Sequence, residues 1–493
     1  MLHGAPLREG AARGLPGAAR AMVFSSVTFL FYFLPLFFLA SYATGRSKTV
    51  LAVFSIVFYA WGEPVFVVLL FASILMNYGL GLRIERAEGR EARAWIAAGV
   101  VLNLIPLLLF KYSGFVLQTL TALVGLSPKY AVKYSFALPL GISFFTFHAL
   151  SYLIDVYRRD VRAERSIRDM VLYIAMFPQL VAGPLVRYKK IAGELHRPRI
   201  TLDRTADGIR LFMIGLAQKV LVANTVSASA DAIFALPQGE LSPLLAWVGI
   251  VCYTVQIYFD FAGYSNMAIG LALMIGFTFP INFNYPYVAR SMTEFWRRWH
   301  ISLSSWFRDY VYIPLGGNRV SPVRTYVNLT VVFLLCGVWH GANWTFVVWG
   351  LMHGLLLVIE RLGFDRVLAR WPAALQHAYV LVLVMITWVF FRADGVGQAF
   401  SYLGAMLGLG AAAPFAPPVQ RFLGWDVLLA LAAAAVGAGP YGARLGRRAL
   451  EGLSGLVRPL GSAAELGTLA VLFGLVAMSL AGGAYNPFIY FRF

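Results

Sequence analysis

Residues 325–360 read TYVNLTVVFLLCGVWHGANWTFVVWGLMHGLLLVIE and decide the fold class of this chain. Two apolar runs stand in tandem here, at 325–340 and 343–360. The first has no charged side chain, and the second has none before Glu360. A helix that spans a bilayer needs about 20 mainly apolar residues, with a range near 17–25. Both runs approach this length, so the stretch predicts two neighbouring membrane helices.

The same composition extends along the whole chain of 493 residues. Hydrophobic residues make up 59% and charged residues 13%. Soluble domains average about 25% charged and 45–50% apolar residues, so this chain lacks the charge to cover a soluble surface. Its apolar content also excludes a disordered chain. Continuous apolar runs replace the alternating pattern of a membrane β-barrel. We therefore expect an all-α polytopic membrane protein.

Apolar runs follow one another from Ser25 onward. Several are shorter than a full span, so we expect roughly 11–13 transmembrane helices, together with re-entrant or interfacial helices. The candidate runs are 26–43, 49–62, 65–81, 95–110, 113–127, 136–154, 169–186, 208–226, 244–259, 262–280, 325–340, 343–360, 377–391, 426–440 and 465–482.

Residues 1–21 differ from the rest of the chain. They read MLHGAPLREGAARGLPGAARA and contain neither an apolar run nor the features of a secretory signal. We expect a disordered extension, or the product of an upstream start codon with Met22 as the functional start. Residues 22–493 are then expected to form a single integral-membrane domain.

The net charge of +18 comes mainly from short basic loops between apolar runs. Such loops set the orientation of spans and meet anionic lipid, and no basic patch interleaved with aromatics predicts nucleic-acid binding. The loops near Arg46 and at 83–93 are expected in the cytoplasm. The basic loop at 158–168 would lie outside if 95–110, 113–127 and 136–154 all crossed. We therefore expect 113–127 to be a helix that does not span.

Two histidines stand out near the middle of the chain. His340 lies at membrane depth in CGVWHGANW, where an imidazole is costly unless it is paired or faces a cavity. His300 lies in TEFWRRWHISLSSWFRD, part of a polar and aromatic stretch at 281–324. If that stretch is helical, His300 shares a face with Trp296 and Phe307. An interhelical hydrogen bond for His340 and an interfacial helix for His300 remain the structural alternatives.

The remaining histidines are expected to be structural. His353 lies in a GxxxG pattern and should pack between helices. His148 and Asp155 are seven residues apart and share a helical face, which suits a buried hydrogen bond better than a proton path. The others lie in the extension, a basic loop or the start of a span, and are expected to be solvated or interfacial: His3, His196 and His377.

The sequence gives little support for a metal site or for a cysteine nucleophile. Cys336 and His340 offer two ligands at four-residue spacing, whereas a metal site needs three or four, so no metal is expected. A Cys336 nucleophile rests only on that spacing and is not favoured. The sequence has no GxSxG, no P-loop and no GxGxxG after a strand, so hydrolase and nucleotide-cofactor functions are not indicated.

Longer motifs carry a resemblance over residues 22–493. They include GISFFTFHALSYLIDVYR from Gly141, FWRRWHISLSSWFRDYVYIPLGGNR from Phe295 and GVWHGANWTFVVWGLMHG from Gly337, with MVFSSVTFLFYFLPLFF, FPQLVAGPLVRY, DFAGYSNMAIG, WVFFRA and FIYFRF in the same order. The chain resembles the membrane-bound O-acyltransferase superfamily, in its bacterial alginate O-acetyltransferase branch. His148 stands where that branch is associated with glutamine.

The resemblance implies a helical fold around a central conical pore in the bacterial cytoplasmic (inner) membrane. It implies transfer of an acyl group to a hydroxyl, with acetyl-CoA or another acyl thioester as co-substrate and no permanently bound cofactor. The implied partners are periplasmic acetylation proteins and a polysaccharide acceptor such as alginate. The two signature positions of the superfamily correspond to His300 and His340, and His340 matches the one regarded as catalytic.

The chemistry of these residue types agrees with that implication. An imidazole at His340 can take the proton of a sugar hydroxyl as it attacks a thioester. The oxyanion then needs a donor, for which Asn343, Trp339 and His300 stay open. Phosphates of a coenzyme A donor favour arginines on the cytoplasmic rim, and the candidates are Arg297, Arg298 and Arg308.

Other functions remain open at this point. The same chemistry could act on peptidoglycan, cellulose or another exopolysaccharide, or deliver D-alanine to teichoic acid. A proton-coupled transporter would use His148, Asp155 and His340 as a relay, although paired broken-helix repeats are absent. A scaffold subunit without chemistry would be indifferent to loss of His340.

Overall fold

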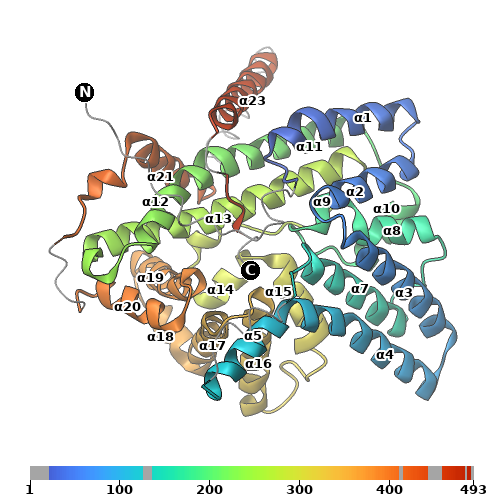
Figure 1. Cartoon of the computed structure of the whole chain (residues 1–493), viewed down its shortest axis with the longest axis horizontal. Coiled ribbons are helices and arrows are strands. Elements are labelled where there is room, and N and C mark those ends of the chain that lie inside the picture. Colours follow the sequence, from blue (N-terminus) through green and yellow to red (C-terminus); the bar gives the residue numbers. More distant parts are fainter. Residues whose placement is uncertain (1–21, 126–135, 410–414, 442–457, 484–485, 490–493) are drawn as a thin grey trace.

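The structure is a computed structural model that describes residues 22–125, 136–409, 415–441, 458–483 and 486–489 (Figure 1). The predicted extension at 1–21 lies outside the described residues. Within them the chain forms helices and no strand. Eight helices are long and apolar enough to cross a membrane, and four shorter apolar helices accompany them. The prediction of an all-α polytopic membrane protein is confirmed, whereas 11–13 crossings would require most of the short helices to cross as well.

The eight long helices are α3 (Val67–Arg86), Gly89–Leu123, Leu202–Phe234, α13 (Pro243–Met274), α16 (Pro322–His340), Trp344–Leu368, α19 (Ala373–Arg392) and Ala463–Ala481 of α23 (Arg458–Ala481). The shorter apolar helices are Phe29–Ala43, which contains η2 (Phe29–Phe33) and α1 (Leu34–Ala43), and α2 (Lys48–Gly62), α7 (Ile142–Tyr157) and α21 (Trp425–Gly437). The short elements that carry no span are α8 (Ile167–Ala175), α9 (Phe177–Leu180), α10 (Tyr188–His196), α14 (Met292–Arg298), α15 (Ile301–Phe307), η7 (Arg308–Tyr312) and α20 (Val396–Met406).

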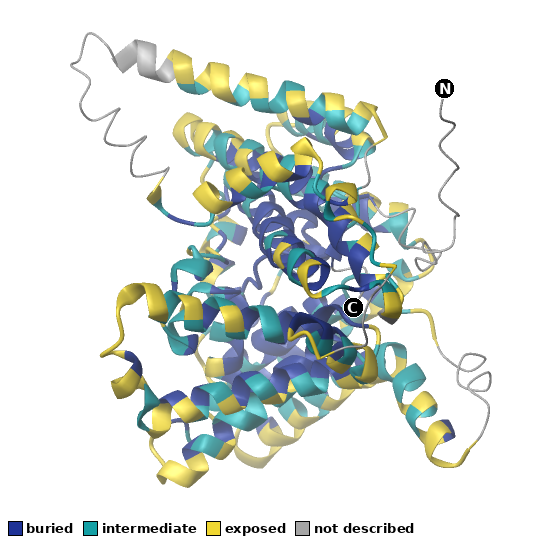
Figure 2. Ribbon diagram, turned by 90° about the vertical axis from the view of Figure 1, so that its left-hand side faces the viewer, coloured by how far each residue is buried: buried dark blue, intermediate teal, exposed yellow. Residues whose placement is uncertain are grey.

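The central helix of the molecule joins two predicted runs. The runs 244–259 and 262–280 were expected as separate spans, but α13 is one helix of 32 residues, so that expectation was wrong. Glycines let it pack closely on α11 (Leu202–Ala217): a Cβ at Gly263 would lie 2.6 Å from the Gly215 carbonyl oxygen. Buried residues gather in the middle of the molecule, whereas α23 at its edge is largely exposed (Figure 2).

A second merger settles the orientation problem. The runs 95–110 and 113–127 share one continuous helix, Gly89–Leu123. The second run therefore adds no candidate span of its own, in line with the expectation that it does not span, but it continues the preceding helix instead of forming a separate one. It consists of α4 (Gly89–Leu107), a π-helical turn η3 (Leu108–Tyr112) and α5 (Ser113–Leu123), with Pro106 just before the π turn. A proline inside a helix is accommodated by such a local change of hydrogen bonding. One crossing replaces two.

With one crossing fewer, the basic loop at 158–168 lies on the same side as the loop at 83–93. Contacts agree with this count. Arg159 donates to the backbone oxygens of Glu85 at 2.6 Å and Ala87 at 2.7 Å. Arg165 pairs with the Glu85 carboxylate. The two basic loops therefore share one face of the protein.

The predicted span at 169–186 is absent. The chain there forms α8 and α9 and then runs without helix to α10, and almost all of it is buried. Pro178 lies in α9, and Gly183 has φ +106°, a left-handed conformation that glycine adopts readily. This irregular backbone is tolerated at depth because other protein elements surround it.

Two of the long helices consist of several elements. Leu202–Phe234 contains α11, η4 (Gln218–Ala223) and α12 (Asn224–Phe234), and Trp344–Leu368 contains α17 (Trp344–Ile359), η8 (Glu360–Phe364) and α18 (Asp365–Leu368). Three short 3-10 turns complete the described elements: η5 (Gln238–Glu240), η6 (Pro286–Val288) and η9 (Val419–Arg421). The helices α14 and α15 lie in the middle of the view, close to α13 and α17 (Figure 1). The part of the polar stretch around His300, from Trp299 to Leu303, is thus largely buried among the helices, whereas residues 318–324 are exposed.

Candidate functional site

His300 lies at a break between α14 and α15. Its backbone has φ +43° and ψ +53°, the left-handed region that a residue other than glycine rarely adopts. The alternative of one continuous amphipathic helix through His300 is therefore wrong. Such strain persists only where surroundings hold it in place, and it gathers at functional sites. The His300 side chain is fully buried.

A hydrogen-bond network orients the His300 ring. Its Nδ1 lies 3.0 Å from the Asn282 Oδ1, which also accepts from the Ser302 hydroxyl at 2.8 Å. The Asn282 amide nitrogen donates to Ser265 of α13 at 3.0 Å. The Ser302 backbone N–H, which can only donate, lies 3.4 Å from Oδ1, so the oxygen end of the amide faces the histidine. Since Oδ1 only accepts, the proton is assigned to Nδ1. Nε2 is then the nitrogen with the lone pair.

His340 is the last residue of α16 and meets His300 inside the protein. Their ring centroids are 6.4 Å apart, although the residues lie on different elements. His340 is 5% exposed, and its Nδ1 has no hydrogen-bond partner within the described chain. Gly337 and Gly350 let α16 and α17 approach closely, as the GxxxG pattern predicted, since a Cβ at Gly337 would lie 3.1 Å from the Gly350 Cα.

Both histidines line one narrow cavity. Its open volume of about 10 Å³ holds roughly one water. Aromatic and aliphatic side chains form the rest of the wall, so the cavity has a low dielectric. The complete lining is Ile257, Phe261, Trp299, His300, His340, Trp349, Trp388, Phe391 and Ile489.

Trp349 is a lining residue that the sequence reasoning missed. Its ring centroid is 5.2 Å from that of His340, its side chain is fully buried, and its indole Nε1 has no partner among the described residues. A buried N–H without a partner costs free energy, so such a group at a reaction site is a candidate donor for a developing charge. A tryptophan in an apolar run carries no signal that separates this role from packing.

The π turn of the long helix holds the end of α16. Lys111 Nζ donates to the backbone oxygens of Trp339 and of His340, the latter at 3.1 Å. The Tyr112 hydroxyl donates to the Val338 oxygen at 2.7 Å. These carbonyls end a helix and lack partners further along it, and a cation suits the negative end of its dipole. Lys111 therefore fixes the backbone that carries His340.

Beside Lys111 lies a polar cavity of about 300 Å³. Asn343 lines it, but its amide is already engaged. Its Oδ1 accepts from the Thr345 N–H at 3.0 Å as the cap of α17, and its Nδ2 donates to the Asp394 oxygen at 3.0 Å. The complete lining is Lys111, Leu138, Gly341, Ala342, Asn343, Phe346, Phe391, Arg392, Ala393 and Asp394.

Trp339 lies close to the histidine pair without lining their cavity. Its ring is 6.2 Å from the His300 ring and stacks on Phe147 at 5.4 Å. Its indole N–H is buried and has no partner among the described residues. Trp339 thus supports the two histidines from behind the cavity wall, and its indole N–H remains available as a hydrogen-bond donor.

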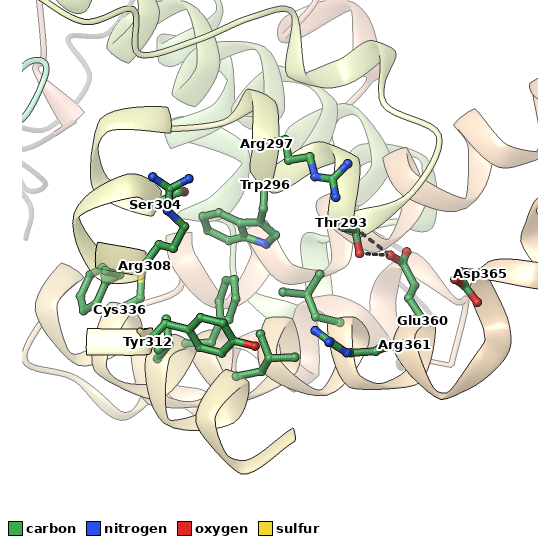
Figure 3. Close-up of a pocket in the computed structure, with 15 residues that line it drawn as sticks. Thr293, Trp296, Arg297, Ser304, Arg308, Tyr312, Cys336, Glu360, Arg361 and Asp365 are labelled. Carbon is green, nitrogen blue, oxygen red and sulfur yellow. Dashed lines mark hydrogen bonds between the residues drawn. The ribbon is translucent and has the colours of Figure 1, made fainter. Parts of the chain in front are cut away.

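A larger cavity of about 430 Å³ is lined in part by residues of α16, among them Phe333 and Cys336 (Figure 3). Exposed guanidinium groups of Arg297, Arg308 and Arg361 stand at its rim. Its floor is apolar apart from Cys336, which lies one helical turn before His340. The complete lining is Thr293, Trp296, Arg297, Ser304, Phe307, Arg308, Tyr312, Leu329, Val332, Phe333, Cys336, Leu357, Glu360, Arg361 and Asp365.

The structure brings Arg297 and Arg308 together and excludes Arg298 from their cavity. Arg298 pairs with Glu294 at 2.8 Å and donates to the Asn284 oxygen at 3.0 Å, which makes it a structural residue. Arg361 takes its place at the rim. No motif marks Arg361, so sequence reasoning missed it.

The two larger cavities open toward opposite faces. Arg158, of the basic loop, donates to the Asp309 oxygen at 3.1 Å, which places the arginine rim on the face of that loop. Burial raises the pKa of the Asp309 carboxyl, but the guanidinium groups of Arg308 and Arg187 outweigh it and leave that pKa below its usual value. Lys111 lies 22 residues into the helix that starts at Gly89 on this face, so it is roughly 33 Å away.

The other buried histidines have structural partners. His353 accepts from the Trp296 indole at 3.2 Å, in agreement with the packing role predicted for it. His148 accepts from the Val186 N–H at 3.3 Å, and Asp155 accepts from the Tyr310 hydroxyl at 2.8 Å. His148 and Asp155 are thus bonded to different elements, which favours the structural interpretation.

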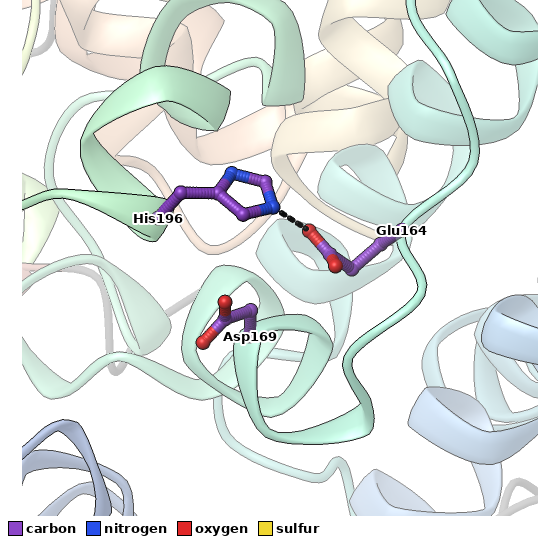
Figure 4. A group of neighbouring side chains, drawn as sticks. All are labelled: Glu164, Asp169 and His196. Atoms are coloured by element: carbon purple, nitrogen blue, oxygen red, sulfur yellow. Dashed lines mark ion pairs between the residues drawn. The ribbon is translucent and has the colours of Figure 1, made fainter.

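One group of side chains within the described residues has a spacing that would suit a metal ion: Glu164, Asp169 and His196 (Figure 4). Protein groups already engage its acids. Glu164 accepts from the Tyr188 hydroxyl at 2.8 Å and from two backbone N–H groups, and Asp169 pairs with Lys48 at 2.7 Å. A cation would have to displace Lys48, so we assign the group to packing.

Comparison with known proteins agrees with this arrangement. Residues 108–394, which contain both histidines, match the membrane-bound O-acyltransferase (MBOAT) family. The chain is 46% identical over 397 residues to a probable alginate O-acetylase of Azotobacter vinelandii, covering 79% of each protein. It is 34% identical over 428 residues to a peptidoglycan O-acetyltransferase of Helicobacter pylori, covering 79% of this chain and 80% of that protein.

A more distant relative extends the range of chemistry. A teichoic acid D-alanyltransferase of Streptococcus thermophilus is 31% identical over 239 residues, which is 45% of this chain and 56% of that protein. The names of these relatives share the transfer of an acyl group and differ in the acceptor. The similarity to the alginate O-acetylase is the higher in identity and in coverage of this chain.

Proposed function

Because the chain belongs to the membrane-bound O-acyltransferase family, we propose that this O-acyltransferase moves acetyl from a cytoplasmic thioester, acetyl-CoA, toward hydroxyl groups of an extracytoplasmic polysaccharide such as alginate. The 46% identity to a probable alginate O-acetylase supports acetyl and alginate as the group and the acceptor. The multi-pass fold and the basic loops on one face suit the bacterial cytoplasmic membrane.

One observation carries the proposal: His300 and His340 share a buried cavity, and larger cavities lie on either side of it. A donor from one side and an acceptor from the other can then meet at the pair without crossing the membrane themselves. Exclusion of water from such a site also protects the thioester from hydrolysis.

In the proposed reaction, His340 takes the proton of the acceptor hydroxyl as its oxygen attacks the thioester carbonyl. The tetrahedral intermediate collapses with loss of the thiolate, which receives the proton from His340. Trp349 Nε1 is the donor we assign to the oxyanion, because it lines the cavity and has no other partner in the described residues. His300, protonated on Nδ1, offers Nε2 to orient the hydroxyl.

The arginine-rimmed cavity is the proposed donor site. Guanidinium groups bind phosphate through paired hydrogen bonds, and coenzyme A carries phosphates on its nucleotide end. Arg297, Arg308 and Arg361 suit that end, whereas the apolar floor suits the pantetheine arm. A pantetheine arm that extends to Cys336 on this floor would bring its thioester end within about one helical turn of His340.

The polar cavity beside Lys111 is the proposed acceptor side. Periplasmic acetylation proteins would receive or guide the acetyl group there. A second acceptor, peptidoglycan, is favoured by the 34% identity to a peptidoglycan O-acetyltransferase over 79% of this chain. The alginate assignment is preferred because the corresponding identity is higher.

The test measures ester-linked acetate on envelope polysaccharides of a deletion strain that carries the wild-type gene or His340→Ala. We expect acetate only with wild type, at equal amounts of membrane protein, and the polymer that regains acetate names the acceptor. Restoration by both genes would remove His340 from catalysis and shift the assignment to His300. Restoration by neither would contradict the proposed acetyl transfer.

A further inference from the structure

We propose that Lys219 and Asp260 are positioning residues that hold the C-terminal segment, residues 486–489, as one wall of the cavity shared by His300 and His340. The segment lies in the middle of the molecule beside α13, far in sequence from both histidines (Figure 1). Its link to catalysis rests on the proposed function. Its position does not, and the two can be tested separately.

The charged pair itself is deeply buried. Lys219 Nζ lies 2.7 Å from Asp260 Oδ1, and the two residues are 2% and 1% exposed. Lys219 belongs to the π turn η4, and Asp260 to the middle of α13. Two charges at membrane depth are costly, and an apolar pair would often serve stability as well. The reaction proposed above does not use them, so the cost of burying them calls for another role.

Each charge also holds the backbone of the C-terminal segment. Asp260 Oδ2 accepts from the Ile489 N–H at 2.8 Å. Lys219 Nζ donates to the Pro487 oxygen and, at 2.6 Å, to Asn224 Oδ1. An apolar pair would offer the segment neither contact. In a low dielectric these charge-assisted bonds are stronger than bonds between neutral groups.

Side-chain amides hold the start of the same segment. Asn486 Oδ1 accepts from Asn224 Nδ2 at 3.0 Å and from the Ser25 hydroxyl at 3.2 Å. Asn486 Nδ2 donates to the Ser25 oxygen at 3.2 Å. Phe488 then stacks on Tyr264 of α13, with ring centroids 4.6 Å apart. Segments from both ends of the chain thus meet around the buried pair.

The contacts that Lys219 and Asp260 make with the C-terminal segment place one of its side chains at the proposed reaction site. Ile489 is 3% exposed and lines the cavity together with both histidines and Trp349. That cavity holds roughly one water, so displacement of Ile489 would open it and admit more. We therefore assign the charged pair the task of keeping the wall closed around the reacting groups.

The first test follows the position of the segment without any assay of activity. Ile489→Cys is introduced into the full-length protein in membranes, and its labelling by a small maleimide is timed. The two native cysteines, Cys252 and Cys336, are buried and give the background. We expect slow labelling of Ile489→Cys alone and at least about tenfold faster labelling when Asp260→Asn is added, because a tenfold change corresponds to only about 1.4 kcal/mol of lost restraint.

A matched control breaks a different ion pair on the same helix bundle. Arg210 and Glu465 join α11 to α23 at the partly exposed edge of the protein. Glu465→Gln in the Ile489→Cys background should leave the labelling rate unchanged. Equal rates for Asp260→Asn and Glu465→Gln would overturn the proposal.

Because a lone buried charge can unfold a protein, two further variants keep the test decisive. Lys219→Met combined with Asp260→Leu removes both charges at once, and Asn486→Ala leaves the pair intact while it weakens the segment. With normal membrane amounts and a normal gel-filtration profile, both should label faster than Ile489→Cys alone. Slow labelling in both folded variants would contradict the proposal that Lys219 and Asp260 hold the C-terminal segment in place.

The second test uses thioester turnover with native Ile489. The same substitutions at Lys219, Asp260 and Asn486 should displace the segment and lower kcat for acetyl transfer. They should leave the KM for acetyl-CoA within about twofold, because the proposed phosphate contacts lie in the arginine-rimmed cavity. Faster labelling together with unchanged kcat would overturn the role in catalysis. Absence of transfer in the wild type as well would contradict the proposed function and leave the labelling result standing.

Discussion

His300 shows how one residue can depart from the local pattern for the sake of a site. The sequence around it is typical of an amphipathic helix, yet its backbone is left-handed and the helix stops there. The hydrogen bond from Nδ1 to Asn282 and the complete burial of the ring offset that strain. Periodicity identified the residue, whereas the conformation that aims its ring depends on Asn282, which lies 18 residues away.

Trp349 supplies the first residue-scale prediction. Trp349→Phe keeps an aromatic side chain, although a smaller one, and removes the unpartnered N–H, so we expect kcat to fall about 10²-fold, the usual loss for one oxyanion donor, with little change in KM. Trp339→Phe is the matched control, because Trp339 does not line the histidine cavity. Thioester turnover by purified protein measures both. A larger loss for Trp339→Phe would move the donor to that residue.

Cys336 supplies the second prediction at the scale of a residue. Its side chain lines the proposed donor cavity and is buried, with no base bonded to its sulfur in the described contacts. A thiol in such surroundings is inert, so Cys336→Ser should retain at least about half of the wild-type turnover. Membrane amounts are compared in parallel. Complete loss at a normal amount would indicate a covalent acyl intermediate on sulfur.

At the scale of elements, breaks and bulges position the chemistry more than the regular helices do. The π turn at Leu108–Tyr112 directs Lys111 and Tyr112 onto the end of α16, and the break between α14 and α15 places His300. Helix ends expose carbonyls and dipoles that a regular helix conceals. Sequence patterns report the regular helices well and these departures poorly.

The arginine rim gives the prediction at this scale. Arg297→Gln and Arg361→Gln should each raise the KM for acetyl-CoA about tenfold, near the 1.4 kcal/mol expected when a charge-assisted contact to phosphate is lost, and leave kcat close to wild type. The effect should shrink as salt rises. Arg298→Gln serves as the control, since Arg298 is bonded to Glu294 and Asn284 away from the cavity. Equal effects of all three would argue against a phosphate site at the rim.

At the scale of the whole molecule, the number of crossings determines which face each cavity meets. Merging 95–110 with 113–127 places the basic loops at 83–93 and 158–168 on one face, where Arg159 and Arg165 contact the end of α3. The positive-inside rule favours the cytoplasm for this face, and on that basis we propose that Lys111 and its polar cavity face the opposite compartment.

Cysteine accessibility tests this orientation. Arg162→Cys lies in the exposed basic loop. Gly397→Cys lies three residues after Asp394, which lines the cavity beside Lys111, and its new side chain meets open space. A maleimide that cannot cross membranes should label Gly397→Cys in intact cells and Arg162→Cys only after permeabilisation. The unsubstituted chain, with both cysteines buried, measures background. The opposite pattern would invert the assignment of donor and acceptor sides.

The sequence by itself determined the class of this protein. Apolar runs and scarce charge required membrane helices. His340 stood out because an imidazole at membrane depth is costly, and His300 because it lies in a polar and aromatic stretch between apolar runs. Those conclusions rest on burial and periodicity, which each local stretch carries in its own residues. The arginine candidates Arg297, Arg298 and Arg308 rested instead on the phosphates of the donor that the family resemblance implies, and their role stays a prediction.

Only the tertiary structure decided which residues meet. It merged 244–259 with 262–280, brought Lys111 to His340, separated Arg298 from the rim and added Arg361, Trp349 and Ile489 to the site. These contacts join residues that lie tens to hundreds of positions apart. Their partners are selected by the packing of whole helices, and the energy of that packing is shared among many side chains, so no single stretch of sequence records it.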